Sequence, residues 1–223
     1  MGLRIGVLCD DEWHPAEIVK QGLAPLAGDG LQFEYSTHAR EWSAAWMDRF
    51  DAVILAKSNR VSAEDRTPWL TEEVQAAFRD YVERGKGLLV LHAGTVGYKE
   101  EPLFRSLAGG VFRSHPAPGP VTLIPARGEA ASLAARITGG MDRFVVHDEH
   151  YEMEADTDEA DIFMHSESEH GIQPAGWMLR RGSGRVAVLT PGHYIGVWLH
   201  PSYQLLLKRV LLGFSSAGMN EHS

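Results

Sequence analysis

Histidine and carboxylate side chains follow several apolar segments of this sequence, where they are placed to do chemistry together. His92 comes directly after one such segment and His193 shortly after another, while Glu149 and His150 stand just beyond a third. An imidazole can bind a metal ion, carry a proton or hydrogen-bond a hydroxyl group, and a carboxylate can act as a base or a metal ligand. These residue types therefore predict acid–base chemistry, with or without a metal ion.

Three roles are predicted for these residues and their neighbours. We expect Glu149 to act as the catalytic base, with His92 and His193 as the other catalytic residues and a histidine as the acid. The residues expected to bind substrate are His115, Asp148, His150, Tyr151 and Trp177. The candidate ligands of a divalent metal ion such as zinc are His92, His150 and His193. The sequence holds no His-Glu-x-x-His motif and no paired cysteines, so the fold would have to bring these ligands together.

Each of these residues also has a structural interpretation that stays open. His92 can simply hydrogen-bond a backbone carbonyl in a tight turn, and Tyr151 and Trp177 can be core aromatics. Cys9 lies near the end of an apolar segment, where a thiol is buried and inert. Six further histidines are expected at the surface or at helix ends: His14, His38, His165, His170, His200 and His222.

Alternating strand-like and helix-like segments must position these side chains. Apolar runs predict strands over 3–9, 52–56 and 87–91, and alternating apolar and polar residues predict a strand over 31–36. Amphipathic segments predict helices over 15–26 and 71–84. Such alternation is typical of a parallel sheet covered by helices on both faces. In these sheets a ligand binds outside the carboxyl ends of the strands, which is where several of the histidines stand.

The second half of the chain predicts further strands joined by short polar turns. These strands are expected over 121–124, 143–146, 162–165, 176–179 and 185–190. Short turns join neighbouring antiparallel strands, so we expect antiparallel additions at one edge of the sheet. An amphipathic helix over 201–214 ends a single domain that spans residues 1–215, and residues 216–223 are expected to be a disordered tail.

The composition argues against several classes of protein. The chain of 223 residues carries a net charge of −9 and no basic run, which argues against nucleic acid or an anionic membrane as a partner. No apolar run approaches the ~20 residues that cross a bilayer. The single cysteine and the absence of a signal peptide predict a cytoplasmic protein. No Gly-x-Gly-x-x-Gly motif follows a strand, so no NAD, flavin or nucleotide cofactor is expected.

Five segments, taken in order, resemble those of the ThuA-like (trehalose utilisation) family. The first four read Gly-Leu-Leu-Val-Leu-His-Ala-Gly at 87–94, Phe-Arg-Ser-His-Pro at 112–116, Asp-Glu-His-Tyr at 148–151 and Pro-Ala-Gly-Trp at 174–177. The fifth covers 184–193, beginning with Gly-Arg-Val and ending with Gly-His. The resemblance covers nearly the whole chain. It implies an α/β fold like that of the class I glutamine amidotransferases, a flavodoxin-like three-layer sandwich whose mostly parallel sheet carries antiparallel additions.

The amidotransferases that this family resembles carry a nucleophilic cysteine in a Gly-x-Cys-x-Gly turn after the strand equivalent to 87–91. Here that turn reads Leu-His-Ala-Gly-Thr, with His92 near its start and no cysteine. A thiolate nucleophile is therefore absent from this turn, and glutamine amidotransferase activity is not expected.

The resemblance further implies a part in bacterial carbohydrate catabolism. Our first hypothesis is that the protein is an isomerase, lyase or hydrolase that acts on a sugar or keto-sugar by acid–base chemistry. Any redox step of the pathway would then be carried out by a separate NAD-dependent sugar dehydrogenase. The alternative is a non-catalytic sugar-binding or regulatory protein, and a weaker possibility is a structural zinc protein. In either of the first two cases we expect a small carbohydrate as the ligand and a homo-oligomer as the assembly.

Overall fold

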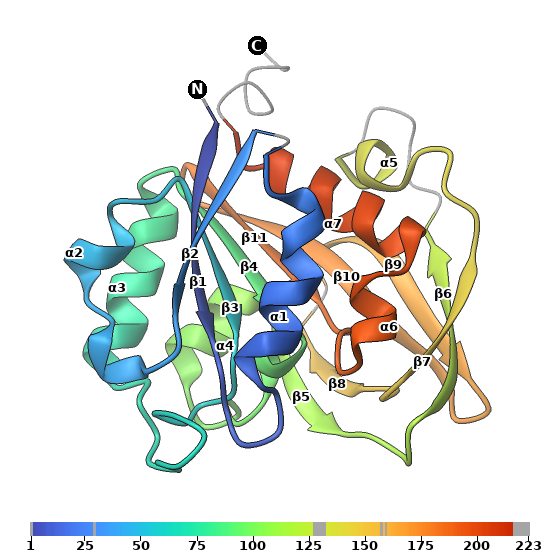
Figure 1. Ribbon diagram of the computed structural model, residues 1–223, viewed down its shortest axis with the longest axis horizontal. Helices are drawn as coiled ribbons and strands as arrows, with labels where there is room; N and C mark the ends of the chain where they lie inside the picture. The colour runs from blue at the N-terminus through green and yellow to red at the C-terminus, as the bar shows by residue number, and fades with distance from the viewer. Residues whose placement is uncertain (1, 29, 127–132, 157, 159, 216–223) are drawn as a thin grey trace.

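A nine-stranded sheet runs through the computed structural model, which describes residues 2–28, 30–126, 133–156, 158 and 160–215 (Figure 1). The order of its strands is β2-β1-β3-β4-β11-β10-β9-β6-β7. The first five strands in this order are parallel, and the other four are added in antiparallel fashion at one side. The predicted mostly parallel sheet with antiparallel additions at one edge is therefore confirmed.

The parallel half is built from five short strands, of which four are apolar and buried on both faces and the fifth is a half-exposed edge strand with alternating polar residues. They are β1 (Leu3–Cys9), β2 (Leu31–Ser36), β3 (Ala52–Ala56), β4 (Gly87–Leu91) and β11 (Gly184–Leu189). The order β2-β1-β3-β4-β11 is that of a flavodoxin-like sheet, in which the carboxyl ends of neighbouring strands meet at one edge. The bounds of the first four strands are those predicted from the sequence.

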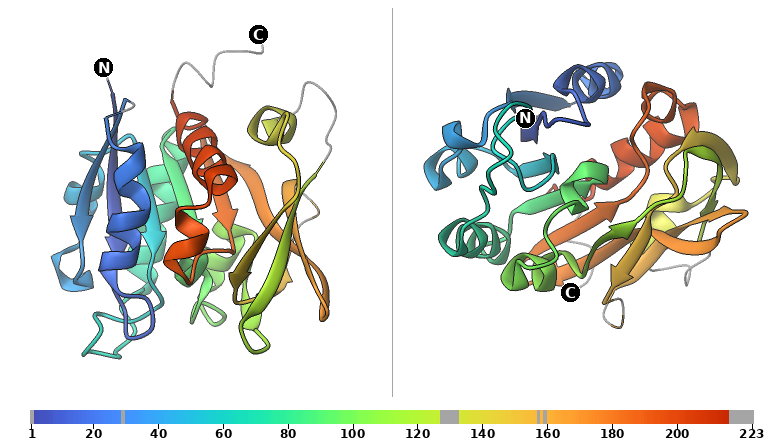
Figure 2. Two further views of the ribbon diagram at one scale, coloured as in Figure 1. Left: turned by 45° about the vertical axis from the view of Figure 1, so that its right-hand side comes forward. Right: turned by 90° about the horizontal axis from the view of Figure 1, so that it is seen from below.

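The antiparallel half extends the sheet beyond β11. Its strands are β6 (Gly119–Pro125), β7 (Phe144–Asp148), β9 (Asp161–Ser168) and β10 (Gly171–Arg181). Two short strands that the sequence pattern did not predict, β5 (Gly110–Ser114) and β8 (Glu152–Ala155), pair with each other in a separate ribbon. This ribbon lies at the same end of the molecule as the loops that leave β4 and β7 (Figures 1 and 2).

Helices cover both faces of the sheet and complete the three layers, as Figure 2 shows. One face carries α1 (Ala16–Leu23), α6 (Ile195–Trp198) and α7 (Pro201–Leu212), and the other carries α2 (Ala44–Met47), α3 (Glu72–Glu83) and α4 (Pro102–Ala108). The remaining helical segments are α5 (Leu133–Thr138) and the short 3₁₀ turns η1 (Ala24–Leu26), η2 (Ala39–Glu41) and η3 (His92–Thr95). Among the described residues, no helix is long and apolar enough to span a membrane.

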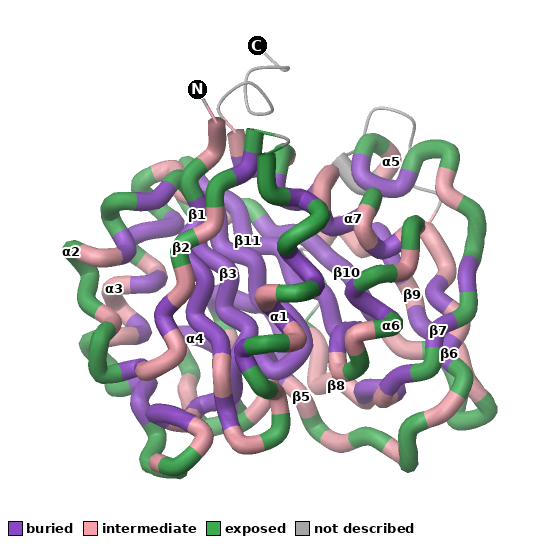
Figure 3. Tube along the Cα trace, viewed as in Figure 1, coloured by how far each residue is buried: buried purple, intermediate pink, exposed green. Residues whose placement is uncertain are grey.

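Alternate side chains of β1, β3, β4 and β11 enter two separate cores, whereas the edge strand β2 contributes to one core only. On β4, Leu89 and Leu91 pack toward α1 and α7, whereas Leu88 and Val90 pack toward α3 and α4. This two-sided burial explains the unbroken apolar runs in the sequence, since a strand with helices on both faces has no face for water. Figure 3 shows these strands buried along most of their length. The tail predicted over 216–223 lies outside the described residues.

Candidate functional site

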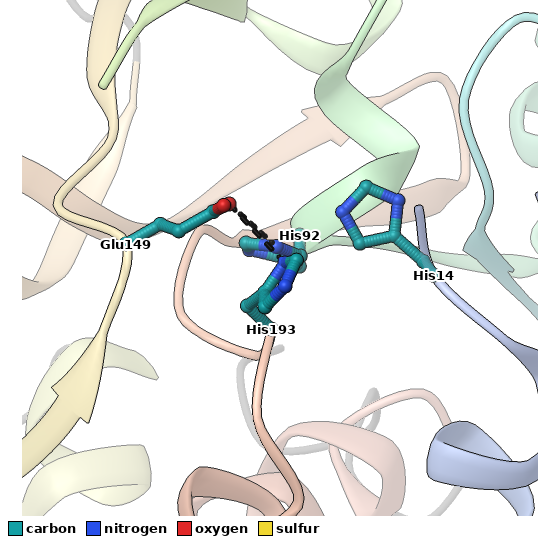
Figure 4. Close-up of side chains that lie close together, drawn as sticks. All are labelled: His14, His92, Glu149 and His193. Carbon is teal, nitrogen blue, oxygen red and sulfur yellow. Dashed lines mark ion pairs between the residues drawn. The ribbon is translucent and has the colours of Figure 1, made fainter. Parts of the chain in front are cut away.

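Four side chains from four distant segments converge at the carboxyl edge of the parallel strands (Figure 4). They are His14, His92, Glu149 and His193, and each offers one nitrogen or oxygen atom that lies within 4.8 Å of those of the others. We call this group the histidine–glutamate cluster. The loops after β1, β4 and β11 bring the three histidines, because these strands end at the same edge of the sheet.

His92 occupies a strained turn directly after β4. Its backbone φ of 44° lies in the left-handed region, which a residue with a side chain adopts at a cost. Its Nδ1 lies 2.7 Å from the backbone oxygen of Thr190, and a carbonyl can only accept, so Nδ1 carries the proton and Nε2 keeps its lone pair. Burial lowers the pKa of His92 to about 4, so the ring is neutral at pH 7.

The tight turn at His92 also requires the glycine two residues further on. A Cβ atom on Gly94 would lie 2.1 Å from the backbone oxygen of Leu55 on the neighbouring strand. Gly94→Ala is therefore expected to lower the free energy of unfolding by about 1–3 kcal/mol, measured by urea denaturation. As a control, Gly196 has open space around its Cβ position, and Gly196→Ala is expected to leave stability unchanged or raise it by up to about 1 kcal/mol. Equal stability of the two variants would contradict this account of the turn.

His14 reaches the cluster from the loop between β1 and α1. Its Nδ1 lies 2.8 Å from Oδ1 of the buried Asp11, so Nε2 is the nitrogen that remains available to the cluster. Its ring meets those of His92 and His193 edge to face, with centroids 4.9 and 5.2 Å apart. The sequence pattern placed His14 among the surface and helix-end residues, and the structure corrects this prediction. The acidic residues that end the first apolar run were the feature that could have revealed it.

Glu149 faces imidazole nitrogens with both of its oxygens. Its Oε2 lies 3.5 Å from Nε2 of His92 and 3.3 Å from Nδ1 of His193, and its Oε1 lies 3.5 Å from Nε2 of His115. Burial alone would raise the pKa of Glu149, but the contact with His193 opposes burial, and the pKa lies well below its usual value. In return, the carboxylate of Glu149 raises the pKa of His193 above the ordinary value.

Two of the distances within the cluster are close to those between ligands of a small cation. Zinc bonds of 2.0–2.1 Å at tetrahedral angles place neighbouring ligand atoms about 3.3–3.4 Å apart. Oε2 of Glu149 stands 3.5 and 3.3 Å from the nitrogens of His92 and His193, close to that separation. The Nδ1 of His193 is buried and makes no hydrogen bond within the described part of the chain. Three imidazoles and one carboxylate are a donor set that suits zinc or a similar divalent ion.

Two further predicted residues border the cluster on its open side. The hydroxyl of Tyr151 lies 3.0 Å from Nε2 of His92, and its ring stacks on that of His92 at 4.3 Å. The Nδ1 of His115 lies 2.8 Å from the backbone oxygen of Pro116, which leaves Nε2 of this ring to face Glu149. The His115 side chain is 33% exposed, so a bound molecule can reach this ring.

On the side of α1 and α6, the cluster adjoins a small apolar pocket of about 10 Å³, which has room for a single water molecule. Ile18, Val19, Leu91 and Trp198 form its apolar wall. Burial beside this wall disfavours a positive charge on His92, so the Nε2 lone pair of that ring stays available for a ligand.

Asp148 supports the cluster from behind. Its carboxylate is 1% exposed and accepts the backbone N–H groups of Gly192 and His193 at 2.8 and 3.0 Å. Burial raises the pKa of Asp148 to about 7, although these two amides act to lower it. Asp148, which was predicted to bind substrate, therefore fixes the loop that carries His193, and both of its oxygens accept hydrogen bonds from backbone N–H groups.

Two other predicted residues lie outside the cluster. His150, a predicted metal ligand and substrate contact, is buried with its Nδ1 2.6 Å from the hydroxyl of Ser168 on β9. Trp177, a predicted substrate contact, is fully buried and donates from Nε1 to the backbone oxygen of Ala108 at 2.8 Å. Cys9 is also buried, and burial raises the pKa of its thiol to about 12, so the thiolate is scarce at pH 7.

Comparison with known proteins assigns this architecture and sequence to a family. The family model for ThuA, described as trehalose utilisation, matches residues 10–212. No curated protein matches the chain. A protein of Parabacteroides merdae described as ThuA-like is 15% identical, with a TM-score of 0.75 over 100% of this chain and 93% of its own. A counterpart from Bacteroides uniformis is 16% identical, with a TM-score of 0.72 over 96% and 93%. A protein of Salmonella typhimurium described as cytoplasmic is 13% identical, with a TM-score of 0.68 over 96% and 100%.

Proposed function

The chain belongs to the ThuA (trehalose utilisation) family, and we propose that it is a metal-dependent enzyme that acts on a sugar or keto-sugar by acid–base chemistry. The observation that carries the proposal is the histidine–glutamate cluster, whose four ligand atoms lie within 4.8 Å of one another. The family description, trehalose utilisation, supports a carbohydrate as the substrate.

The proposed ligands of the ion are His14, His92 and His193 together with Oε2 of Glu149. In His14 and His92 the free nitrogen is Nε2, because Nδ1 of each ring already donates to a fixed acceptor. This acceptor is the carboxylate of Asp11 for His14 and the backbone carbonyl of Thr190 for His92. Binding would displace any proton from His193, since a ligating imidazole must be neutral. A bound divalent ion would polarise a substrate carbonyl or lower the pKa of a coordinated hydroxyl.

His115 is the proposed acid–base residue. Its ring is held by the backbone oxygen of Pro116 with Nε2 directed at Glu149 and partly open to solvent. At this position Nε2 can take a proton from a carbon or hydroxyl group beside the substrate carbonyl and return it elsewhere on the substrate. Glu149, predicted as the base, serves in this proposal as a ligand through Oε2, while its Oε1 would stabilise the ring of His115 once Nε2 has taken up a proton.

The proposal is tested on untagged protein by metal analysis and by turnover of a panel of keto-sugars. We expect close to one equivalent of divalent metal, loss of turnover after chelation, and recovery when the metal is added back. Glu149→Gln keeps the size of the side chain but removes its charge, so it should weaken metal binding and turnover together. Less than about a tenth of an equivalent, with no uptake of added zinc, would contradict the metal site. A metal-bound protein that converts no keto-sugar would favour the non-catalytic alternative.

A further inference from the structure

Asp11 has a buried carboxylate that joins three parts of the molecule. Its side chain is 0% exposed, and its Oδ1 accepts the backbone N–H groups of Trp13 and His14 at 2.9 and 3.1 Å. The same oxygen lies 2.8 Å from Nδ1 of the His14 ring. Its Oδ2 accepts the N–H of Ser58 at 2.7 Å, just beyond the end of β3. The carboxylate therefore fixes the backbone and the ring of His14 and ties both to the neighbouring strand.

We infer that Asp11 is a positioning residue for the metal ion, which it controls by holding His14 with Nδ1 protonated and Nε2 free to bind. This inference rests on the proposed function. A carboxylate can only accept a hydrogen bond, so the contact at 2.8 Å requires the proton of His14 to be on Nδ1. A carboxylate partner also makes the opposite nitrogen of an imidazole more basic, which strengthens its bond to a metal ion.

The loop itself does not need Asp11 to begin the helix that follows. That task belongs to the preceding residue, Asp10, whose Oδ1 accepts the N–H of Ala16 at 2.9 Å at the start of α1. The backbone φ of 82° at Asp10 turns the chain sharply at this point. Asp10 therefore contacts the start of the helix, whereas Asp11 contacts His14 of the cluster. This division supplies a matched pair of variants.

The test compares Asp11→Asn with Asp10→Asn in zinc titrations of metal-free protein against a chromogenic chelator. Both variants lose one negative charge in the same loop, and asparagine can still cap a helix. Asparagine is neutral and has one carbonyl oxygen in place of the two carboxylate oxygens that meet His14 and Ser58, so Asp11→Asn removes the charge that holds the proton of His14 on Nδ1 and makes its Nε2 a stronger ligand. We expect Asp11→Asn to bind zinc about 10–100-fold more weakly than wild type and Asp10→Asn to bind it as wild type does. The absorption spectrum of the cobalt-loaded protein should change only in Asp11→Asn.

A second measurement keeps the inference testable even if Asp11→Asn does not fold. Nitrogen-15 NMR of the histidine rings in wild-type metal-free protein should show His14 with its proton on Nδ1, the resonance being assigned from its loss in His14→Gln. A folded Asp11→Asn that binds zinc as tightly as wild type, or a wild-type His14 with its proton on Nε2, would overturn the inference. Failure of the proposed function is a different result, in which wild type itself takes up no zinc.

Discussion

His14→Ala is expected to weaken zinc binding by at least about 100-fold, whereas His150→Ala should leave it unchanged. Even the loss of an outer partner of a metal ligand costs about 10–100-fold in affinity, and His14 is proposed to bind the ion directly. His150 lies outside the cluster, with its Nδ1 on the hydroxyl of Ser168. The comparison sets His14, the ligand proposed from the structure, against His150, the ligand predicted from the sequence pattern.

The two variants form a matched pair because each removes one largely buried imidazole from the same region of the protein. Zinc affinity is measured by competition with a chelator, and thermal unfolding of the metal-free proteins confirms that both are folded. A loss of similar size in both variants would indicate a general disturbance of the fold. A larger loss in His150→Ala would mean that the proposed ligand set is wrong.

Trp177→Ala is expected to lower the free energy of unfolding by about 3–5 kcal/mol, the usual cost of removing a large buried aromatic side chain. The indole is fully buried in the core on the side of α3 and α4, and its Nε1 donates to the backbone oxygen of Ala108 at 2.8 Å. Truncation would leave a cavity and an unpaired carbonyl. Guanidinium denaturation followed by far-ultraviolet circular dichroism measures the effect.

Trp13→Ala is the control for this prediction, since it also removes one indole. Trp13 is 62% exposed, so its loss should change stability by no more than about 0.5 kcal/mol. If Trp177→Ala were as stable as wild type and lost affinity for a sugar, the role in substrate binding predicted for Trp177 would be supported instead. A second variant, Trp177→Phe, keeps most of the buried volume and should bind zinc as wild type does.

The parallel half of the fold was predictable because four of its five strands are buried on two faces and the edge strand β2 alternates apolar and polar residues. Runs such as 52–56 and 87–91 contain no charged residue, and their bounds match the strands of the structure. The ribbon of β5 and β8 was not predicted. Its strands are short, carry partly exposed charged residues such as Glu152 and Glu154, and pair only with each other. A short half-exposed strand has no periodicity that separates it from a loop.

The candidate site was predictable only to the level of the segments that build it. His92, Glu149 and His193 were identified as residues that follow strands, and the sheet brings those strand ends together. The direction of each side chain was not encoded in such a pattern, so Glu149 and His150 were equally eligible although only Glu149 faces the cluster. His14 stands close to the end of β1, but its neighbour Trp13 and the helix that follows gave it the pattern of a helix end.

The position of β11 has a consequence for how the protein is assembled during synthesis. This strand comes last in the sequence, yet it lies between β4 and β10 and is the element through which the parallel and antiparallel halves share hydrogen bonds. Residues up to the end of β11 must therefore be synthesised before the sheet becomes continuous. Since His193 follows β11, a chain that has not reached this point lacks one of the proposed ligands, and binding of an ion by the proposed set can only follow the closure of the sheet.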